Sequence, residues 1–139
     1  MSFPQKSSLA TVVALVAVYG CYFAVVGVRL DGDVEAVAYK PFLVLAVVVL
    51  AVLMAVSHTA LALLWPHDAD VVDERDRQIG WRSDRVGGYV LAVGVCGVLT
   101  LALVEAPHFY IANAALLAWV LAELSGHVTR LALYRRGGG

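Results

Sequence analysis

Four long runs of apolar residues, separated by short polar segments, dominate the pattern along the chain. The runs cover about residues 9–29, 42–65, 86–104 and 109–133. A helix needs roughly 20 apolar residues to cross the hydrocarbon core of a membrane, and each run is close to this length. The runs are too long, and alternate too weakly between apolar and polar positions, for the strands of a membrane barrel. The pattern therefore predicts an all-α fold, an integral membrane four-helix bundle.

The first run could instead belong to a cleaved signal peptide, whose apolar core usually has about 7–15 residues. Residues 9–28 hold no charged side chain, so this run is longer than such a core and is better explained as a span. Composition agrees, because 61% of the 139 residues are hydrophobic, against about 45–50% apolar residues in soluble domains. We expect a single transmembrane domain over residues 1–139. The net charge of −1 gives no indication of nucleic-acid binding.

The polar segment between the second and third runs, residues 67–85, is densely charged. Asp73 and Glu74 precede Arg77 by four and three positions, the spacings at which opposite charges pair on a helix. The segment therefore predicts a charged interfacial helix that leads into the third span. Such a charge run is usually a solvated face, but it could also bind a cytoplasmic protein or a second copy of the chain. The candidate partner-facing residues are Asp73, Glu74, Arg75, Asp76, Arg77, Ile79 and Trp81.

Cations set the expected orientation. With four spans, Arg29 and Lys40 lie on one side of the membrane, and the other eight cations lie on the opposite side: Lys6, Arg75, Arg77, Arg82, Arg85, Arg130, Arg135 and Arg136. An excess of Lys and Arg marks the cytoplasmic side. Both termini and the charged segment are therefore predicted to be cytoplasmic, in a cell inner membrane. Trp81 and the arginines could then also lie among lipid headgroups, where each cation contributes about 1 kcal/mol.

Glycines recur at helical spacing through the third span. Gly80, Gly87 and Gly94 are seven positions apart, and Gly97 follows about one turn later. Small residues on one face let transmembrane helices approach closely. These glycines are therefore predicted to pack helices together. They could also mediate self-association, so we expect a homo-oligomer or a larger membrane complex.

Glu123 is the most unusual residue of the fourth run, because an ionised carboxylate within a membrane costs several kcal/mol and usually faces a partner. His127 follows it by four positions, on the same helical face. In a four-span chain the second and fourth spans are parallel, and a rise of about 1.5 Å per residue places His58 at a similar depth. We therefore expect an intramembrane polar cluster of Ser57, His58, Glu123 and His127, whose hydrogen bonds offset the cost of desolvation.

Three interpretations of this cluster remain open. It could simply fix which helices pair, or it could serve a small proton or ion transporter or channel, since intramembrane acid and histidine groups mark such paths. A redox accessory subunit that binds quinone, or haem through His58 and His127, is the third. Covalent haem is not indicated, because no CxxCH is present, and Cys21 and Cys96 lack metal-site spacing. We predict neither a metal nor a bound cofactor.

The sequence DERDRQI at residues 73–79, followed by Ser83, Arg85 and Tyr89, resembles a family of small, uncharacterised bacterial and archaeal membrane proteins. Members have four predicted spans and a DERD-x-x-I motif before the third. The resemblance implies this architecture and suggests that residues 73–76 and Ile79 act together, but it implies no activity. The chain carries no recognised catalytic motif. We therefore expect a non-enzymatic interaction, accessory or regulatory membrane subunit that acts through its charged segment.

Overall fold

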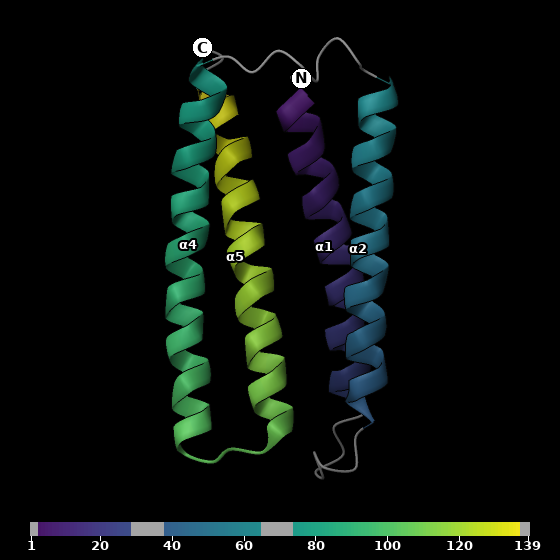
Figure 1. The fold of residues 1–139 in the computed structure, drawn as a ribbon, viewed down its shortest axis with the longest axis vertical. Coiled ribbons are helices and arrows are strands. Elements are labelled where there is room, and N and C mark those ends of the chain that lie inside the picture. Colours follow the sequence, from purple (N-terminus) through teal and green to yellow (C-terminus); the bar gives the residue numbers. More distant parts are fainter. Residues whose placement is uncertain (1–2, 29–37, 65–73, 137–139) are drawn as a thin grey trace.

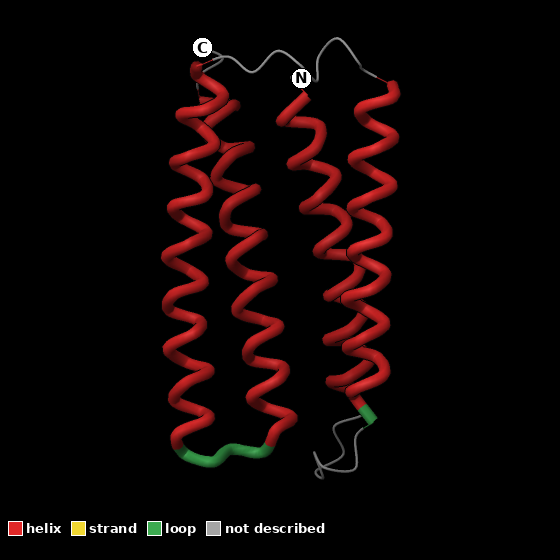
Figure 2. Tube along the Cα trace, viewed as in Figure 1, coloured by secondary structure: helices red, strands yellow, loops and turns green. Residues whose placement is uncertain are grey.

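The computed structural model describes residues 3–28, 38–64 and 74–136. Within these ranges the chain forms four α-helices and no strand (Figures 1 and 2). They are α1 (Phe3–Val28), α2 (Tyr39–Leu64), α4 (Glu74–Leu103) and α5 (His108–Arg136). The predicted all-α class is therefore confirmed. All four helices are long and apolar enough to cross a membrane, which is compatible with a multi-pass membrane protein.

The helices lie side by side in the spatial order α4, α5, α1, α2 (Figure 1). The extensive contacts are those of α4 with α5, of α5 with α1 and of α1 with α2. Large apolar side chains point outward from this row, with exposed fractions of 61% for Val13, 56% for Val52 and 75% for Val93. In water such exposure would oppose folding, whereas lipid tails are as apolar as these side chains. The arrangement therefore suits a lipid environment.

A stripe of α1 packs against its neighbours through aromatic and polar contacts. The stripe has six buried side chains: Ser8, Thr11, Leu15, Tyr19, Tyr22 and Val26. The Tyr22 hydroxyl donates a hydrogen bond of 2.7 Å to Oδ1 of Asn113 in α5. Tyr19 meets Trp119 of α5 edge to face, with ring centroids 6.2 Å apart. These contacts place α1 antiparallel to α5, with the N-terminus of α1 near the C-terminus of α5 (Figure 1).

A tight turn joins α4 to α5. Glu105 adopts a left-handed conformation with φ of 53°. Its backbone N–H donates to the carbonyl of Ala102, and the N–H of Ala106 donates to the carbonyl of Leu101. This pair of bonds satisfies carbonyls at the end of a helix in the Schellman pattern, and Pro107 then prevents continuation of α4. The turn brings α5 back along α4 over its full length.

The glycines of α4 allow α5 to approach. A Cβ atom added at Gly94 would collide with Cβ of Ala118, and one added at Gly87 would lie 3.0 Å from the carbonyl oxygen of Ala122. At Gly80 the nearest atom would be Nη2 of Arg130, at 3.5 Å. Around Gly97 there is open space, because it lies round the helix by about 60° from Gly94 and about 100° from Gly80. The face formed by Gly80, Gly87 and Gly94 is thus occupied by α5 of the same chain.

Candidate functional site

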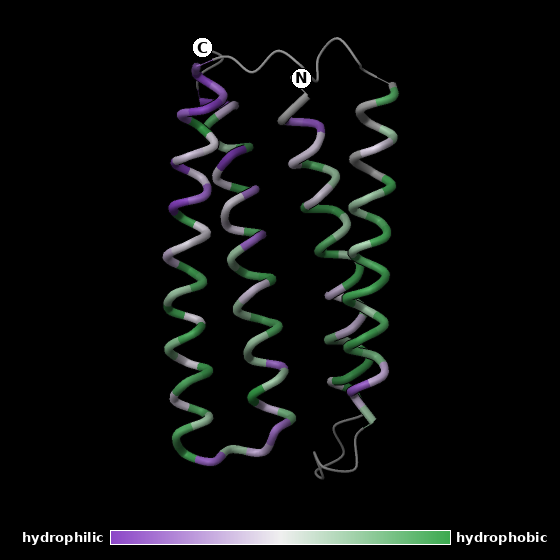
Figure 3. The backbone as a smooth tube through the Cα atoms, viewed as in Figure 1, coloured by the Kyte–Doolittle hydropathy of each residue, from purple (hydrophilic) through white to green (hydrophobic). Residues whose placement is uncertain are grey.

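Helix α4 continues without a break from the charged segment into the third span. Its 30 residues measure about 45 Å, at 1.5 Å per residue, whereas a hydrocarbon core is about 30 Å thick. The helix therefore extends well beyond the core at one end. The charged residues of α4 all lie within residues 74–85, and this hydrophilic end of α4 lies beside the C-terminal end of α5 (Figure 3). We call residues 74–85 of α4 the charged extension.

Charges at the helix ends stabilise the beginning of α4 and the end of α5. Glu74 and Asp76 lie in the first turn of α4, and Arg135 and Arg136 lie in the last turn of α5. Acidic groups are stabilised near the positive N-terminal end of a helix dipole, and cations near the negative C-terminal end. The two antiparallel helices therefore bring complementary charges to the same end of the pair.

One side of the charged extension is bound to α5. The Tyr134 hydroxyl donates a hydrogen bond of 2.6 Å to Oδ1 of Asp76. Ile79 is buried, and Ser83 is fully buried. The Ser83 Oγ lies 2.9 Å from the carbonyl oxygen of Ile79 and accepts a hydrogen bond of 3.3 Å from Nε of Arg130. Asp76 and Ile79, which the sequence assigned to a partner-facing set, therefore face α5.

The other side of the charged extension is open. Glu74, Arg75 and Arg77 are exposed, and Trp81 is 70% exposed. Glu74 and Arg77 form an ion pair of 3.9 Å between two largely exposed side chains, an arrangement that contributes little to stability. Asp73 lies outside the described residues. The DERD-x-x-I motif is thus divided between the contact with α5 and an outward surface.

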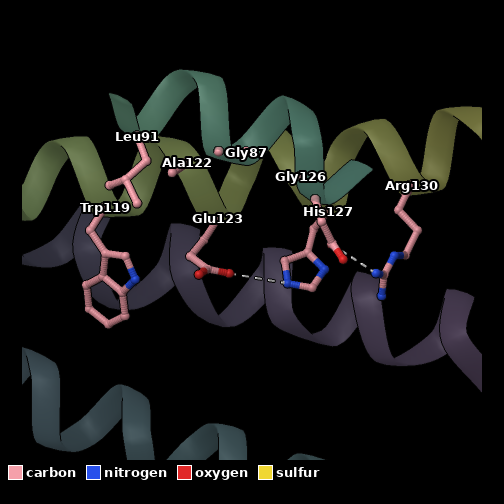
Figure 4. Close-up of a pocket in the computed structure, with 10 residues that line it drawn as sticks. Gly87, Leu91, Trp119, Ala122, Glu123, Gly126, His127 and Arg130 are labelled. Carbon is pink, nitrogen blue, oxygen red and sulfur yellow. Dashed lines mark hydrogen bonds and ion pairs between the residues drawn. The ribbon is translucent and has the colours of Figure 1, made fainter. Parts of the chain in front are cut away.

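A groove of about 320 Å³ lies between α4 and α5, just inside the charged extension (Figure 4). We call it the α4–α5 groove. Glycines leave its floor without side chains, Leu91 and Trp119 line it at one level, and ionisable groups line it nearer the charged extension. Its complete lining is Asp84, Gly87, Gly88, Leu91, Trp119, Ala122, Glu123, Gly126, His127 and Arg130.

Two contacts between ionisable side chains lie in this groove. Nε2 of His127 is 3.7 Å from Oε2 of Glu123, and the side chains are 22% and 45% exposed, respectively. Nη2 of Arg130 lies 3.3 Å from Oδ1 of Asp84. Trp119, Glu123 and His127 project from the same side of α5 (Figure 4), as their spacing of four residues requires.

The depth of Glu123 follows from the register between α4 and α5. It lines the groove with Gly87 and Leu91, only a few residues from the charged extension. Counted from His108, Glu123 lies about 22 Å along α5, at 1.5 Å per residue. In a core of about 30 Å that began at His108, Glu123 would lie toward the far boundary, where an ionised group is less costly than at the centre. In the sequence, Glu123 is near the middle of its apolar run because that run continues beyond this boundary.

The predicted cluster also included Ser57 and His58. Both belong to α2, but their side chains lie outside the described part of the structure. Helix α2 packs on α1 and diverges from α5 toward the end that carries His127 (Figure 1). This arrangement gives no support to a contact of Ser57 or His58 with Glu123 and His127, or to haem held by His58 and His127. Among the described residues, no group of three or more His, Cys, Asp or Glu is arranged to hold a metal ion.

Comparisons with known proteins supply no relative from which a role could be taken. A scan against protein-family models matches none of them, and searches of curated proteins and of solved structures find no similar chain. The resemblance to the DERD-x-x-I family therefore stays a prediction.

Sequence reasoning did not pair α4 with the end of α5. Tyr134 and Arg130 are the α5 side chains that hold the charged extension, and neither was among the candidate site residues. Their spacing of four places them on one helical face, as the spacing of seven does for Asp76 and Ser83. Aligning these two faces in antiparallel order, with Gly87 and Gly94 against α5, would have suggested the pairing.

Proposed function

We propose that this chain is a non-enzymatic membrane protein that acts as an interaction, accessory or regulatory subunit, with the charged extension as its binding surface. The observation that carries the proposal is the division of that extension. Asp76, Ile79 and Ser83 attach it to α5, which leaves a preformed outward surface. A preformed surface loses little conformational entropy on binding.

The chemistry of the outward surface favours an acidic protein as the partner. The exposed side chains of the charged extension include two carboxylates, four guanidinium groups and an indole: Glu74, Asp84, Arg75, Arg77, Arg82, Arg85 and Trp81. Trp and Arg are enriched among the residues that contribute most to protein interfaces. The excess of positive charge would attract an acidic partner and steer its approach.

We place this surface on the cytoplasmic side of a cytoplasmic membrane, with both termini on the same side. The support is the location of the cations, since Arg75, Arg82 and Arg85 of α4 and Arg135 and Arg136 of α5 belong to the same end of the helix pair (Figure 3). Lys40 lies in the first turn of α2, which begins at the opposite end. The excess of Lys and Arg is expected on the cytoplasmic side.

Photo-crosslinking tests the proposed binding surface. A photoreactive amino acid at position 81 should give a protein adduct in cells, whereas one at position 93 should give lipid adducts, because Val93 is 75% exposed but lies within the apolar part of the same helix. Changing Arg82 and Arg85 to Glu should remove the adduct at 81 while leaving the helical content unchanged. Lipid adducts alone at position 81 would contradict the proposal, and a product of twice the chain mass would make a second copy the partner.

A further inference from the structure

We propose that the α4–α5 groove binds a lipophilic cation, an organic ammonium or phosphonium group attached to apolar substituents, that enters from the membrane. The groove shares Asp84 with the charged extension but is lined by none of the arginines of that extension and not by Trp81, so this inference goes beyond the proposed function and does not depend on it. It rests on the charge of the groove, the order of its groups and the shape of its floor.

The charge of the lining favours a cation. Arg130 and Asp84 offset each other across 3.3 Å, and Arg130 also donates to Ser83. Among the described residues, the ionisable side chain paired with Glu123 is His127, at 3.7 Å, which is too far for a hydrogen bond. By the formal count at pH 7, in which His is neutral, the lining carries one excess negative charge, on Glu123. That side chain is 45% exposed and can therefore be reached by a ligand.

The order of groups along the groove specifies the kind of cation. Moving along α5 toward the charged extension, the lining presents Trp119, then Glu123, then His127, then Arg130. Gly94 of α4 packs beside Ala118 of α5, and Gly87 packs beside Ala122. Leu91 lies between these two glycines, so it is level with Trp119, at the apolar end of the groove. A cation at Glu123 would thus have apolar surface on its membrane side, and the ring of Trp119 could add a cation–π contact.

A phospholipid fits this order less well. In its normal orientation the phosphate of an aminophospholipid lies deeper in the membrane than the amine. Such a headgroup would bring its phosphate toward the carboxylate of Glu123 and its amine toward the guanidinium of Arg130, which are like-charge contacts. A single cationic centre joined directly to apolar groups avoids both contacts.

Glycines of α4 create the space for this ligand, and they offer a way to close it. A Cβ at Gly88 would meet no atom within 4 Å, although Gly88 lines the groove. A larger side chain at this position would therefore fill the groove without colliding with α5. Gly97, on the same helix, also has open space around it but lies outside the groove. Gly88→Leu and Gly97→Leu form a matched pair for the experiment.

The experiment measures binding of radiolabelled tetraphenylphosphonium to the full chain in lipid nanodiscs by equilibrium dialysis. We expect saturable binding that weakens at least tenfold in Glu123→Gln and in Gly88→Leu and is unchanged in Gly97→Leu and Glu74→Gln. Tetraphenylborate, which has the same shape and the opposite charge, should show no binding that depends on Glu123. Circular dichroism establishes that each variant keeps its helices. If Glu123→Gln does not fold, Gly88→Leu still tests whether binding occurs in the groove.

Three results would overturn the inference. The first is tetraphenylphosphonium binding that does not saturate. The second is saturable binding that is unaffected by Glu123→Gln and Gly88→Leu. The third is a phospholipid that stays bound to the parent chain in native mass spectrometry, disappears in Gly88→Leu and is not displaced by tetraphenylphosphonium. This last outcome would assign the groove to a lipid.

Discussion

Single side chains at the charged extension connect positions that are far apart in the sequence. Asp76 and Tyr134 are separated by 58 residues and joined by a hydrogen bond of 2.6 Å. Tyr134 is 9% exposed, so the bond is largely shielded from water. A hydrogen bond to a charged acceptor contributes about 1.5–3 kcal/mol. The contact therefore helps to hold the beginning of α4 against α5.

Removing this hydrogen bond should destabilise the pair of helices. We expect Tyr134→Phe to lower the free energy of unfolding by about 1–3 kcal/mol, because the carboxylate of Asp76 loses its donor while the aromatic ring is kept. Unfolding in a mild detergent, followed by circular dichroism, measures the effect. Tyr89→Phe is the control, since Tyr89 is 67% exposed and should show no loss.

A double-mutant cycle with Asp76→Asn tests whether the effect belongs to the contact. Residues joined by a hydrogen bond should show a non-additive effect when both are changed, whereas independent residues add. Fully additive losses for Tyr134→Phe and Asp76→Asn would show that the bond of 2.6 Å is not what stabilises this end.

At this scale the sequence predicted the character of residues better than their contacts. The charge of Asp76 and its place on a helix could be predicted from the local sequence, but its direction could not. A helical face exposed to water and one facing a polar side chain of another helix can carry the same residue types. Only the spatial proximity of Tyr134 distinguishes the two for Asp76. The exposed Trp81, by contrast, lies on the outward side of the helix.

At the scale of the element, α4 combines two environments in one continuous helix. Its first turns carry most of the charge, and the rest is apolar. The sequence predicted this continuity because no Pro lies between residues 74 and 103. The recurrence of Gly80, Gly87 and Gly94 predicted a packing face. It did not reveal that α5 of the same chain occupies that face, since close packing within a chain and between chains demands the same small residues.

Replacing either of two glycines of α4 by Ala adds one methyl group, but the two changes should affect stability differently. Gly94→Ala should destabilise the chain by about 1–3 kcal/mol, because the added carbon collides with Ala118 and overpacking carries a cost of this order. Gly97→Ala should be neutral or stabilising by up to about 1 kcal/mol, because it fills open space and Ala favours a helix. Unfolding in detergent compares the two variants, and equal effects would contradict the register between α4 and α5.

At the scale of the whole molecule, four membrane-length helices were predictable and their neighbours were not. The spans are apolar around much of their circumference, so periodicity does not reveal which face packs on a protein and which on lipid. This is why the sequence could suggest a contact between α2 and α5 at His58, whereas the extensive contacts of α2 are with α1. Depth was uncertain for the same reason, because an apolar run does not mark where the membrane ends.

The proposed orientation can be tested by labelling from one side. In a chain with Cys21 and Cys96 changed to Ala, Trp81→Cys should react with a membrane-impermeant maleimide only in inside-out vesicles. Lys40→Cys, at the opposite end of the row, should react in intact cells. Both side chains are exposed, so access depends on the side of the membrane. Labelling of Trp81→Cys in intact cells would reverse the orientation.

Arg130 belongs to two surfaces at once. It donates hydrogen bonds to Ser83 and Asp84 at the base of the charged extension, and it also lines the α4–α5 groove. A molecule in the groove that shifted this guanidinium would weaken the attachment of the charged extension to α5. A protein bound to the charged extension would, in turn, change the position of Arg130 in the groove. Thermodynamic linkage makes such an influence reciprocal, so each occupant would change the affinity of the other by the same factor.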